Sequence, residues 1–542
     1  MAFDRVLLGG SVIDGSGTPA RREDVGLAGG RISAVGDLRD TEARVTLDCT
    51  GKTVTPGFID IHSHSDWLLP GVDHARLVEP FVRQGMTTLV GGNCGFSPAP
   101  VTAANRRAAT EASRLIVDDV LDLRWETMAE FLDVLDDASP ALNIAQLVGH
   151  GAVRAAVCGP LDPAEPDAGQ LADMERLVRE ALDAGCFGVS TGLGYAPGIF
   201  AGHDELAAFA RWAAASDRLF TSHLRAYSRM SGVYQSDANE LAHNLRAIDE
   251  MLEVADDAGA RLQISHLIFV GRRTWPTHVD ALARIEAARE RGLDVAFDAF
   301  PYTAGNTTAA VLFPPEVLPE LEKILSSPDD MAALRAFADA AFAEVGFDLT
   351  DIQIMRANAA EFDDYDGLFV GEAAERAGMD IWDFYARLVV ESHRNARVLI
   401  HRYSGDDDDE TALRAVLAHP LCTIETDTFV TEHGHQNPAS FGTFPRVLAT
   451  YVEAGLFTLE EAVRKMTGAA AERLGLTDRG CIEPGAAADL VVLHGDRLRD
   501  TATFASPASA PVGIEHVFIN GHHVIDGPRY HSGLAPGRVL RA

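Results

Sequence analysis

The chain has 542 residues, of which 47% are hydrophobic, and it carries 80 acidic against 46 basic side chains, a formal net charge of −34. This length is sufficient for one large barrel-type domain with smaller attachments. So acidic a surface repels phosphate backbones and anionic lipids, which argues against a partner among nucleic acids or membrane surfaces.

The cysteines and the N-terminus bear on the compartment. The six cysteines are scattered and form no Cys-x-x-Cys pair, so a disulfide framework is not expected and a reducing compartment fits best. The first residues lack the basic start and long apolar run of a signal peptide. No apolar run approaches the ~18–20 residues needed to span a membrane. We expect a soluble cytoplasmic protein.

The two ends of the chain have the same kind of sequence pattern. Residues 3–52 contain short, alternating, turn-rich segments, and segments 488–493, 514–521 and 523–527 repeat this pattern near the C-terminus. Short strands at such spacing are typical of a small β-sandwich. We predict that residues 1–54 and 475–542 fold together into one β domain.

Between the ends runs a repeated pattern of apolar strand followed by amphipathic helix. The pattern predicts parallel strands joined by helical crossovers, an α/β fold of (β/α)8 TIM-barrel type over residues 55–302 and 394–474. In such barrels the chemistry lies at the C-terminal ends of the strands. The predicted strands are 54–61, 87–91, 144–148, 188–191, 219–222, 261–265, 294–297 and 423–425.

The interval before the last barrel strand is too long for one crossover. Residues 303–393 hold Pro-rich turns, helical runs and an extra strand-like segment at 352–355. We predict an inserted subdomain that lies over the barrel mouth as a cover.

Histidines gather at the predicted strand ends. His62 and His64 are two apart, so on a strand they point to the same side. Two imidazoles side by side suit a divalent metal such as zinc, although a satisfied pair on a polar strand end is the alternative. His223 and His266 also close apolar strands; each alone reads as a structural histidine, but four together favour a metal centre.

Two further residues complete the constellation. Asp427 closes the last strand and reads as a carboxylate ligand or proton carrier, with a helix N-cap as the alternative. Cys94 stands in a glycine turn, where a thiolate can bind zinc, although most free cysteines are buried fillers. Such a set serves metal-assisted hydrolysis, in which a carboxylate takes the proton of an activated water. Asp427 is the candidate.

Ordered motifs along nearly the whole chain carry a resemblance to a known family. They include Pro56-Gly-Phe-Ile-Asp-Ile-His-Ser-His-Ser-Asp66, Gly92-Asn-Cys-Gly95, Gly188-Val-Ser-Thr-Gly-Leu-Gly-Tyr195 and Gln263-Ile-Ser-His266. With these segments the chain resembles the amidohydrolase superfamily, and within it the N-acyl-D-amino-acid deacylases (D-aminoacylases).

The resemblance implies roles for the candidate ligands. A tightly held zinc would be bound by Cys94, His223 and His266. His62, His64 and Asp427 would line a second, weaker metal position. Most superfamily members bridge two metals with a carboxylated lysine, whereas the deacylases have cysteine there, as this chain has Cys94. The match favours one firmly occupied zinc site.

The departures from the family pattern concern the substrate. The deacylase lysine that helps to hold the substrate carboxylate corresponds to Ile268, the first tyrosine of Tyr-Pro-Tyr to Phe300, and a serine to Asn306. Tyr302 is kept. A site without its cation binds a free carboxylate less well. The expected substrate-binding residues are Ile268, Phe300, Tyr302 and Asn306, with His433 and His435 after the last strand. Arg225, Arg272 or Arg273 is the expected replacement cation.

These observations lead to one expected activity and two alternatives. We expect zinc-dependent hydrolysis of a small-molecule amide, foremost of an N-acyl-D-amino acid. The altered carboxylate positions leave open a cyclic or neutral amide or a carbamate. A metal-free scaffold is the remaining alternative, although it should have lost the metal ligands. The superfamily resemblance also makes a homo-oligomer an expected state.

Overall fold

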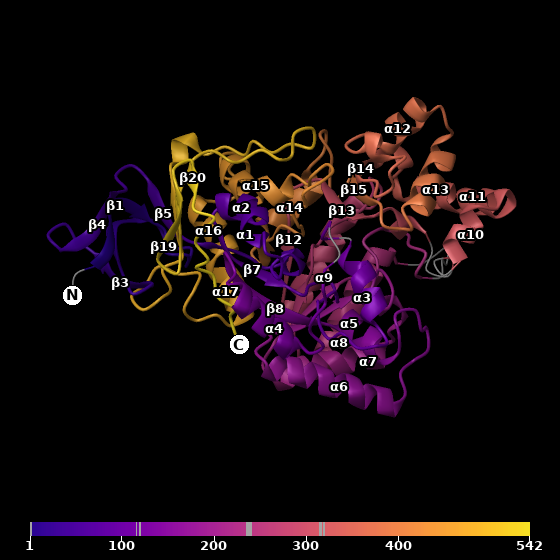
Figure 1. Ribbon diagram of the computed structural model, residues 1–542, viewed down its shortest axis with the longest axis horizontal. Coiled ribbons are helices and arrows are strands. Elements are labelled where there is room, and N and C mark those ends of the chain that lie inside the picture. The colour runs from indigo at the N-terminus through magenta and orange to yellow at the C-terminus, as the bar shows by residue number, and fades with distance from the viewer. Residues whose placement is uncertain (1–2, 115, 119–120, 235–240, 314–316, 318–319) are drawn as a thin grey trace.

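The computed structural model describes residues 3–114, 116–118, 121–234, 241–313, 317 and 320–542 (Figure 1). Residues 1–2 of the predicted β domain and 314–316 and 318–319 of the predicted insert lie outside this description. Within the described ranges, no helix has both the length and the apolar character that crossing a membrane requires.

The centre of the molecule is the predicted barrel sheet. Its eight strands are all parallel, and they follow one another around the sheet in chain order, with β16 at one end and β6 at the other. Their residues are buried almost throughout, which explains why they read as continuous apolar runs. The strands are β6 (Phe58–Asp60), β7 (Met86–Gly91), β8 (Asn143–Gly149), β9 (Gly188–Gly192), β10 (Leu219–His223), β11 (Arg261–Ile264), β12 (Val295–Ala299) and β16 (Cys422–Ile424).

Helices cover the outside of this sheet, as the repeated strand-and-helix pattern predicts. An apolar face on each packs against the strands. They are α1 (His74–Leu77), α2 (Glu79–Arg83), α3 (Arg106–Ser113), α4 (Met128–Ala138), α5 (His150–Val157), α6 (Ala168–Asp183), α7 (His203–Ala215), α8 (His243–Ala258), α9 (His278–Glu290), α14 (Thr411–Ala418), α15 (Ala439–Arg446), α16 (Leu459–Met466) and α17 (Gly468–Leu474).

Polar contacts draw the first and last barrel strands together. The buried carboxylate of Asp60 accepts hydrogen bonds from the backbone N–H of Thr426 (3.0 Å) and from its hydroxyl (2.6 Å). Just beyond, the N–H of Asp427 donates to the carbonyl of His62 at 3.0 Å. These bonds link the two strand ends that carry candidate metal ligands.

The predicted first barrel strand, 54–61, is two strands. β5 (Thr53–Pro56) pairs with β1 and β17 in the terminal sheet, whereas β6 belongs to the barrel. Gly57 separates them, and a side chain there would collide with Thr87, since an added Cβ lies 2.2 Å from its Oγ1. The prediction of one strand was wrong because the apolar run is continuous across a corner between two sheets.

Both chain ends meet in one β domain, as expected. They form one hydrogen-bonded sheet of nine strands, in the order β20-β19-β18-β17-β5-β1-β2-β3 with β4 beside β1, whose fold encloses an apolar core. Its other strands are β1 (Phe3–Val12), β2 (Arg21–Ala28), β3 (Arg31–Gly36), β4 (Ala43–Asp48), β17 (Leu490–Leu493), β18 (Ile514–Ile519), β19 (His522–Asp526) and β20 (Arg529–Tyr530).

The insert has its own small sheet and its own core. β13 (Ala304–Thr308), β15 (Arg397–His401) and β14 (Ile352–Arg356) are antiparallel, and β14 confirms the strand predicted at 352–355. The sheet extends beyond the predicted insert boundary at residue 393. Four helices pack on it: α10 (Leu321–Leu325), α11 (Pro328–Val345), α12 (Val370–Ala377) and α13 (Ile381–Glu391).

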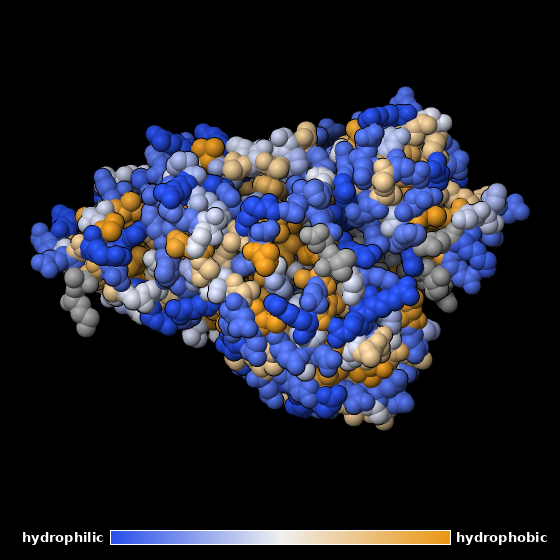
Figure 2. Space-filling model, in the orientation of Figure 1, coloured by the Kyte–Doolittle hydropathy of each residue, from blue (hydrophilic) through white to orange (hydrophobic). Residues whose placement is uncertain are grey.

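The visible face of the molecule is mostly hydrophilic, with scattered apolar groups (Figure 2). This agrees with the net charge of −34.

Candidate metal centre and active site

Three predicted zinc ligands converge at the C-terminal mouth of the barrel. Cys94 Sγ lies 3.6 Å from His223 Nδ1 and 3.4 Å from His266 Nε2, and the two ring nitrogens are 2.9 Å apart. The three side chains come from the loop after β7, the end of β10 and the turn after β11. Parallel strands that end on the same side of a barrel bring them together.

This group has the dimensions of a zinc site. Zn–N bonds of ~2.0–2.1 Å and Zn–S bonds of ~2.3 Å give a tetrahedron with edges of roughly 3.3–3.6 Å. The measured separations match these edges to within about half an ångström. One sulfur and two imidazole nitrogens that face one another in a buried pocket fit a divalent metal with a preference for zinc.

A second group shares Cys94. His62 Nε2 lies 3.1 Å from Cys94 Sγ and 3.5 Å from Asp427 Oδ1, and His64 Nε2 lies 3.4 Å from the same carboxylate oxygen. His62, His64, Cys94 and Asp427 therefore offer four ligand atoms within 4.8 Å of one another. The structure brings all six predicted ligands into one cluster with two adjoining positions.

Three of these six residues have a left-handed backbone. The φ angles are 56° at Cys94, 33° at His266 and 47° at Asp427. For residues with a Cβ this conformation is uncommon and costs free energy, of order 1–3 kcal/mol each. Such strain persists where the surroundings fix it, and it concentrates at functional sites.

The turn that carries Cys94 is held from several sides. The N–H of Gly92 donates to Asp66 Oδ2 (2.8 Å), and the Tyr195 hydroxyl donates to the carbonyl of Cys94 (2.8 Å). Gly92 has a φ of 75°, and a Cβ there would lie 2.1 Å from the carbonyl oxygen of Leu147. Only glycine fits this close approach to β8, so the motif around Cys94 fixes the position of the sulfur.

Asp298, at the end of β12, positions two histidines. Its Oδ1 accepts a hydrogen bond from the N–H of His266 at 2.6 Å and lies 3.4 Å from Nδ1 of His62. A carboxylate beside the second nitrogen of a ligating histidine sets the ring's tautomer and orientation. The sequence analysis did not identify this role of Asp298.

The charges in the cluster suit metal binding and proton transfer. Burial alone would raise the pKa of the Cys94 thiol, but His62 and His266 outweigh it and hold this pKa well below its ordinary value. Burial also opposes ionisation of Asp427, yet His266 and the contact with His64 lower its pKa. A thiolate is the form that binds zinc, and an ionised carboxylate can accept a proton.

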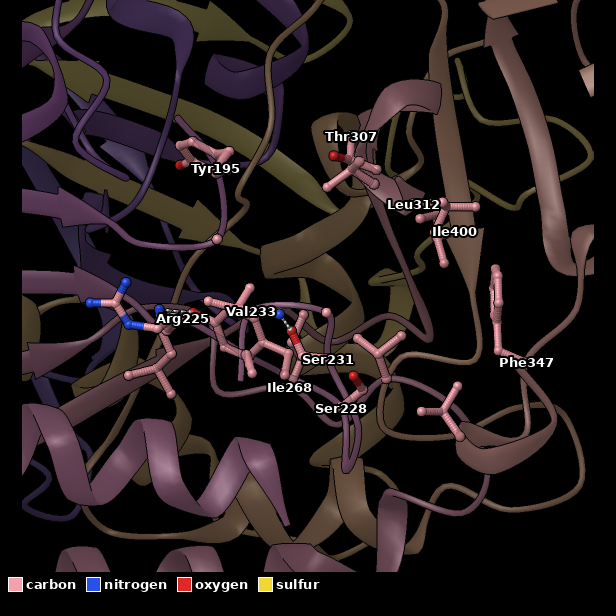
Figure 3. A pocket seen from close by; sticks show the side chains of 18 of the residues that line it. Tyr195, Arg225, Ser228, Ser231, Val233, Ile268, Thr307, Leu312, Phe347 and Ile400 are labelled. Atoms are coloured by element: carbon pink, nitrogen blue, oxygen red, sulfur yellow. Dashed lines mark hydrogen bonds between the residues drawn. The ribbon is translucent and has the colours of Figure 1, made fainter. Parts of the chain in front are cut away.

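A cavity of about 370 Å³ opens beside the cluster. Figure 3 shows some of the side chains that line it. Its inner end is lined by His64, Cys94, His223, His266 and Asp427. The remaining lining is mostly apolar and comes from the barrel loops and the insert, with Met230, Val233, Ile268, Val270, Leu312, Phe313, Phe342, Phe347 and Ile400 among its members. We call this part of the cavity the apolar chamber.

The predicted substrate residues divide into two groups. Ile268 and Asn306 line the cavity, and Asn306 accepts a hydrogen bond from the side chain of Asn437 through Oδ1 (2.7 Å). Phe300 and Tyr302 pack with Ile268 in a small apolar cluster. The Tyr302 hydroxyl lies 3.4 Å from Asp500 Oδ2, so its polar end serves a contact within the protein.

Arg225 lines the cavity, but its guanidinium is already paired. It forms a bidentate contact with Glu250 (Nη2–Oε1 2.8 Å) and donates to the carbonyls of Ile199 and Ala201 at 2.8 and 2.9 Å. In Figure 3 it points away from the chamber side chains. These bonds use the donors that a substrate carboxylate would need.

The two loop histidines take different places. His433 is exposed, and its backbone N–H contacts Asp118. The His435 ring contacts the carbonyl of Phe504 through Nε2 at 2.7 Å and lies beside Gln353 of the insert sheet. Neither residue lines the cavity described above.

Sequence reasoning missed the apolar chamber and the Tyr403 ring that lines it. The chamber residues lie in segments far apart in the chain, and their apolar pattern resembles that of any packed helix or strand. Tyr403 follows β15, which was not recognised as a strand of the insert.

Fold and site together define a metal-dependent hydrolase: a (β/α)8 barrel with a Cys/His cluster and a carboxylate at its C-terminal mouth. The family model of the amidohydrolases (Amidohydro_3, "Amidohydrolase family") matches residues 45–345 and 392–525. The chain belongs to this family.

Known relatives match almost the whole chain. It is 36% identical to an N-acyl-D-glutamate deacylase of Alcaligenes xylosoxydans xylosoxydans over 99% of this chain and 96% of that protein. It is 34% identical to a D-aminoacylase of the same organism over 99% and 97%. The crystal structure of N-acyl-D-glutamate deacylase from Bordetella bronchiseptica, complexed with zinc and a phosphonate inhibitor, is similar with a TM-score of 0.78 and 33% identity over 100% of both chains.

Proposed function

We propose that the protein is a zinc-dependent deacylase that hydrolyses the amide bond of N-acyl-D-amino acids. The grouping of Cys94, His223 and His266, with Asp427 at the edge of the same cavity, carries this proposal. Identities of 36% and 34% to deacylases of D-amino acids over 99% of the chain support it.

In this proposal Cys94, His223 and His266 hold the zinc, which when bound supplies Lewis-acid activation of water and of the amide carbonyl. His62 and His64 orient the Asp427 carboxylate, whose Oδ1 lies 3.5 and 3.4 Å from their Nε2 atoms. Asp427 accepts the proton of the attacking water and then delivers it to the leaving nitrogen.

The apolar chamber favours substrates with an apolar side chain or acyl group. An acidic side chain, as in the substrate named for the glutamate deacylase, calls for a cation within contact distance. Among the described residues that line the cavity, the basic side chains are Arg225, which is fully paired, and the histidines of the metal cluster. The lysines also lie elsewhere: Lys52 pairs with Glu515, Lys323 with Glu320, and Lys465 donates to a carbonyl.

Outside the metal cluster, Arg225 is the basic side chain in the described cavity lining, and it is paired with Glu250. This shortage of cations supports a second candidate function, the hydrolysis of neutral or cyclic amides. An N-acyl-D-amino acid presents a free carboxylate, and Ile268 stands where the deacylases have a lysine. The cavity is also lined by neutral polar side chains that can serve a neutral amide or, more weakly, a carboxylate: Asn306, Thr307, Ser228, Ser231, Tyr195, Tyr227 and Tyr403.

A substrate panel tests these proposals. The zinc-loaded protein is assayed with N-acetyl-D-leucine, N-acetyl-L-leucine, N-acetyl-D-glutamate and N-acetyl-D-leucinamide. We expect D-leucine to be released fastest, since each buried methylene contributes ~0.8 kcal/mol, about fourfold in kcat/KM. Cleavage of the leucinamide alone would favour the neutral-amide candidate. Absence of hydrolysis with zinc bound would overturn both.

A further inference from the structure

A second cluster of metal-binding side chains lies in the nine-stranded sheet, outside the barrel. His516 is on β18, and His523 and Asp526 are on the neighbouring antiparallel strand β19. Each offers one ligand atom, and the three atoms lie within 4.8 Å of one another. The proposed deacylase chemistry does not use them.

An irregularity in the strand pairing brings the three side chains together. His516 pairs with Asp526 and Phe518 with His523, and a register shift between Val517 and Phe518 leaves Val524 as an extra residue. On a regular strand, residues three apart face opposite sides. The bulge turns His523 to the same side as Asp526, and bulges commonly re-aim side chains at functional positions.

The distances suit a small divalent ion. His516 Nδ1 lies 3.1 Å from His523 Nε2 and 3.4 Å from Asp526 Oδ1, and the third separation, His523 Nε2 to Asp526 Oδ1, is 3.9 Å. Zinc bonds of ~2.0–2.2 Å to nitrogen and oxygen give a tetrahedron with edges of roughly 3.3–3.5 Å. The carboxylate is too far from either ring for a charge-assisted hydrogen bond, which is typically ~2.7–2.9 Å.

The surroundings hold two ligands firmly and leave the third accessible. The His523 ring stacks on Phe518 at 4.4 Å, and the His516 side chain is 10% exposed, whereas that of Asp526 is 56% exposed. Two cations lie nearby: Lys52 is neutralised by Glu515 at 2.7 Å, and the Arg5 guanidinium lies over the Phe518 ring at 4.9 Å. An ion can therefore enter from solvent and keep water at its open coordination position.

We infer that His516, His523 and Asp526 form a second divalent-metal site, for zinc or a similar transition-metal ion, that fastens the strand pair β18–β19. Two imidazoles and one carboxylate are ligands that zinc binds in proteins. The site is independent of the zinc centre in the barrel, so it adds metal capacity without taking part in amide hydrolysis.

Equilibrium dialysis against zinc, followed by metal analysis, tests the inference on the full-length protein with its active site already loaded. We compare the wild type with His523→Ala, with Asp526→Asn and with His522→Ala, a matched control because His522 is the adjacent, exposed histidine. The wild type and His522→Ala are expected to bind one more zinc per chain than His523→Ala.

Asp526→Asn keeps the shape of the side chain, so a loss of zinc binding in this variant is not explained by a folding defect. Even outer-shell partners contribute about 10–100-fold to metal affinity, so loss of a direct ligand should weaken zinc binding by at least that order. Unchanged hydrolysis in all variants would agree with the inference. Equal zinc uptake by the wild type and His523→Ala, or an equal loss in His522→Ala, would overturn it.

Discussion

Replacing Asp427 by asparagine removes the proposed proton carrier while preserving its shape. In the wild type the N–H of Asp427 donates to the carbonyl of His62 at 3.0 Å, and the variant keeps this backbone bond. The substitution leaves Cys94, His223 and His266 unchanged. An amide cannot accept the proton of the attacking water. General acid–base catalysis contributes typically ~10²–10⁴-fold, so kcat should fall by this factor, about 2.7–5.5 kcal/mol in barrier height.

The assay measures kcat, KM and zinc content on one preparation of Asp427→Asn. We expect the zinc content to stay near that of the wild type while kcat falls and KM changes little. Glu432→Gln is the matched control, because Glu432 is an exposed acid of the same segment that does not line the cavity. A variant of Asp427 that retains kcat within tenfold of the wild type would refute the assigned role.

Three further substitutions test separate parts of the account. Ile268→Lys places a cation in the cavity. The kcat/KM for N-acetyl-D-glutamate, divided by that for N-acetyl-D-leucine, should then rise about tenfold or more. An unchanged ratio would place carboxylate recognition elsewhere. Arg225→Met removes the cation from Glu250, whose carboxylate keeps the hydrogen bond from the Tyr234 hydroxyl (2.7 Å). The free energy of unfolding should fall by about 3 kcal/mol with little change in KM, as urea denaturation and kinetics can measure. A large KM effect without destabilisation would make Arg225 a substrate ligand. Burial raises the pKa of Glu425 well above its ordinary value of 4.5. Above pH 4.5 the unfolded chain therefore loses this proton more readily than the folded protein does. The free energy of unfolding of the wild type should fall relative to that of Glu425→Gln as the pH rises. Parallel pH dependences of unfolding for the two proteins would contradict that shift.

Much of the barrel could be predicted from sequence because its strands are buried on both faces. Strands such as β8 and β10 are rich in apolar residues, and each candidate ligand stands at or just after the end of such a strand. Since parallel strands end on one side of a barrel, position along the chain was enough to bring His62, Cys94, His223, His266 and Asp427 together.

Other features depend on contacts that no local pattern encodes. The corner at Gly57 is set by Thr87 across the sheet, and the pairing of Arg225 is decided by Glu250 on α8. The apolar chamber needs the insert to be placed against the barrel loops, and its residues look like ordinary core residues in sequence.

The most direct test of the central claim is the zinc content of the wild type and of Cys94→Ala, measured with N-acetyl-D-leucine hydrolysis on the same samples. We predict about one tightly held zinc in the barrel of the wild type, and loss of both zinc and hydrolysis in the variant, because the thiolate is the anionic ligand of the proposed site. Retention of that zinc by Cys94→Ala, or hydrolysis by wild-type protein freed of metal, would contradict it.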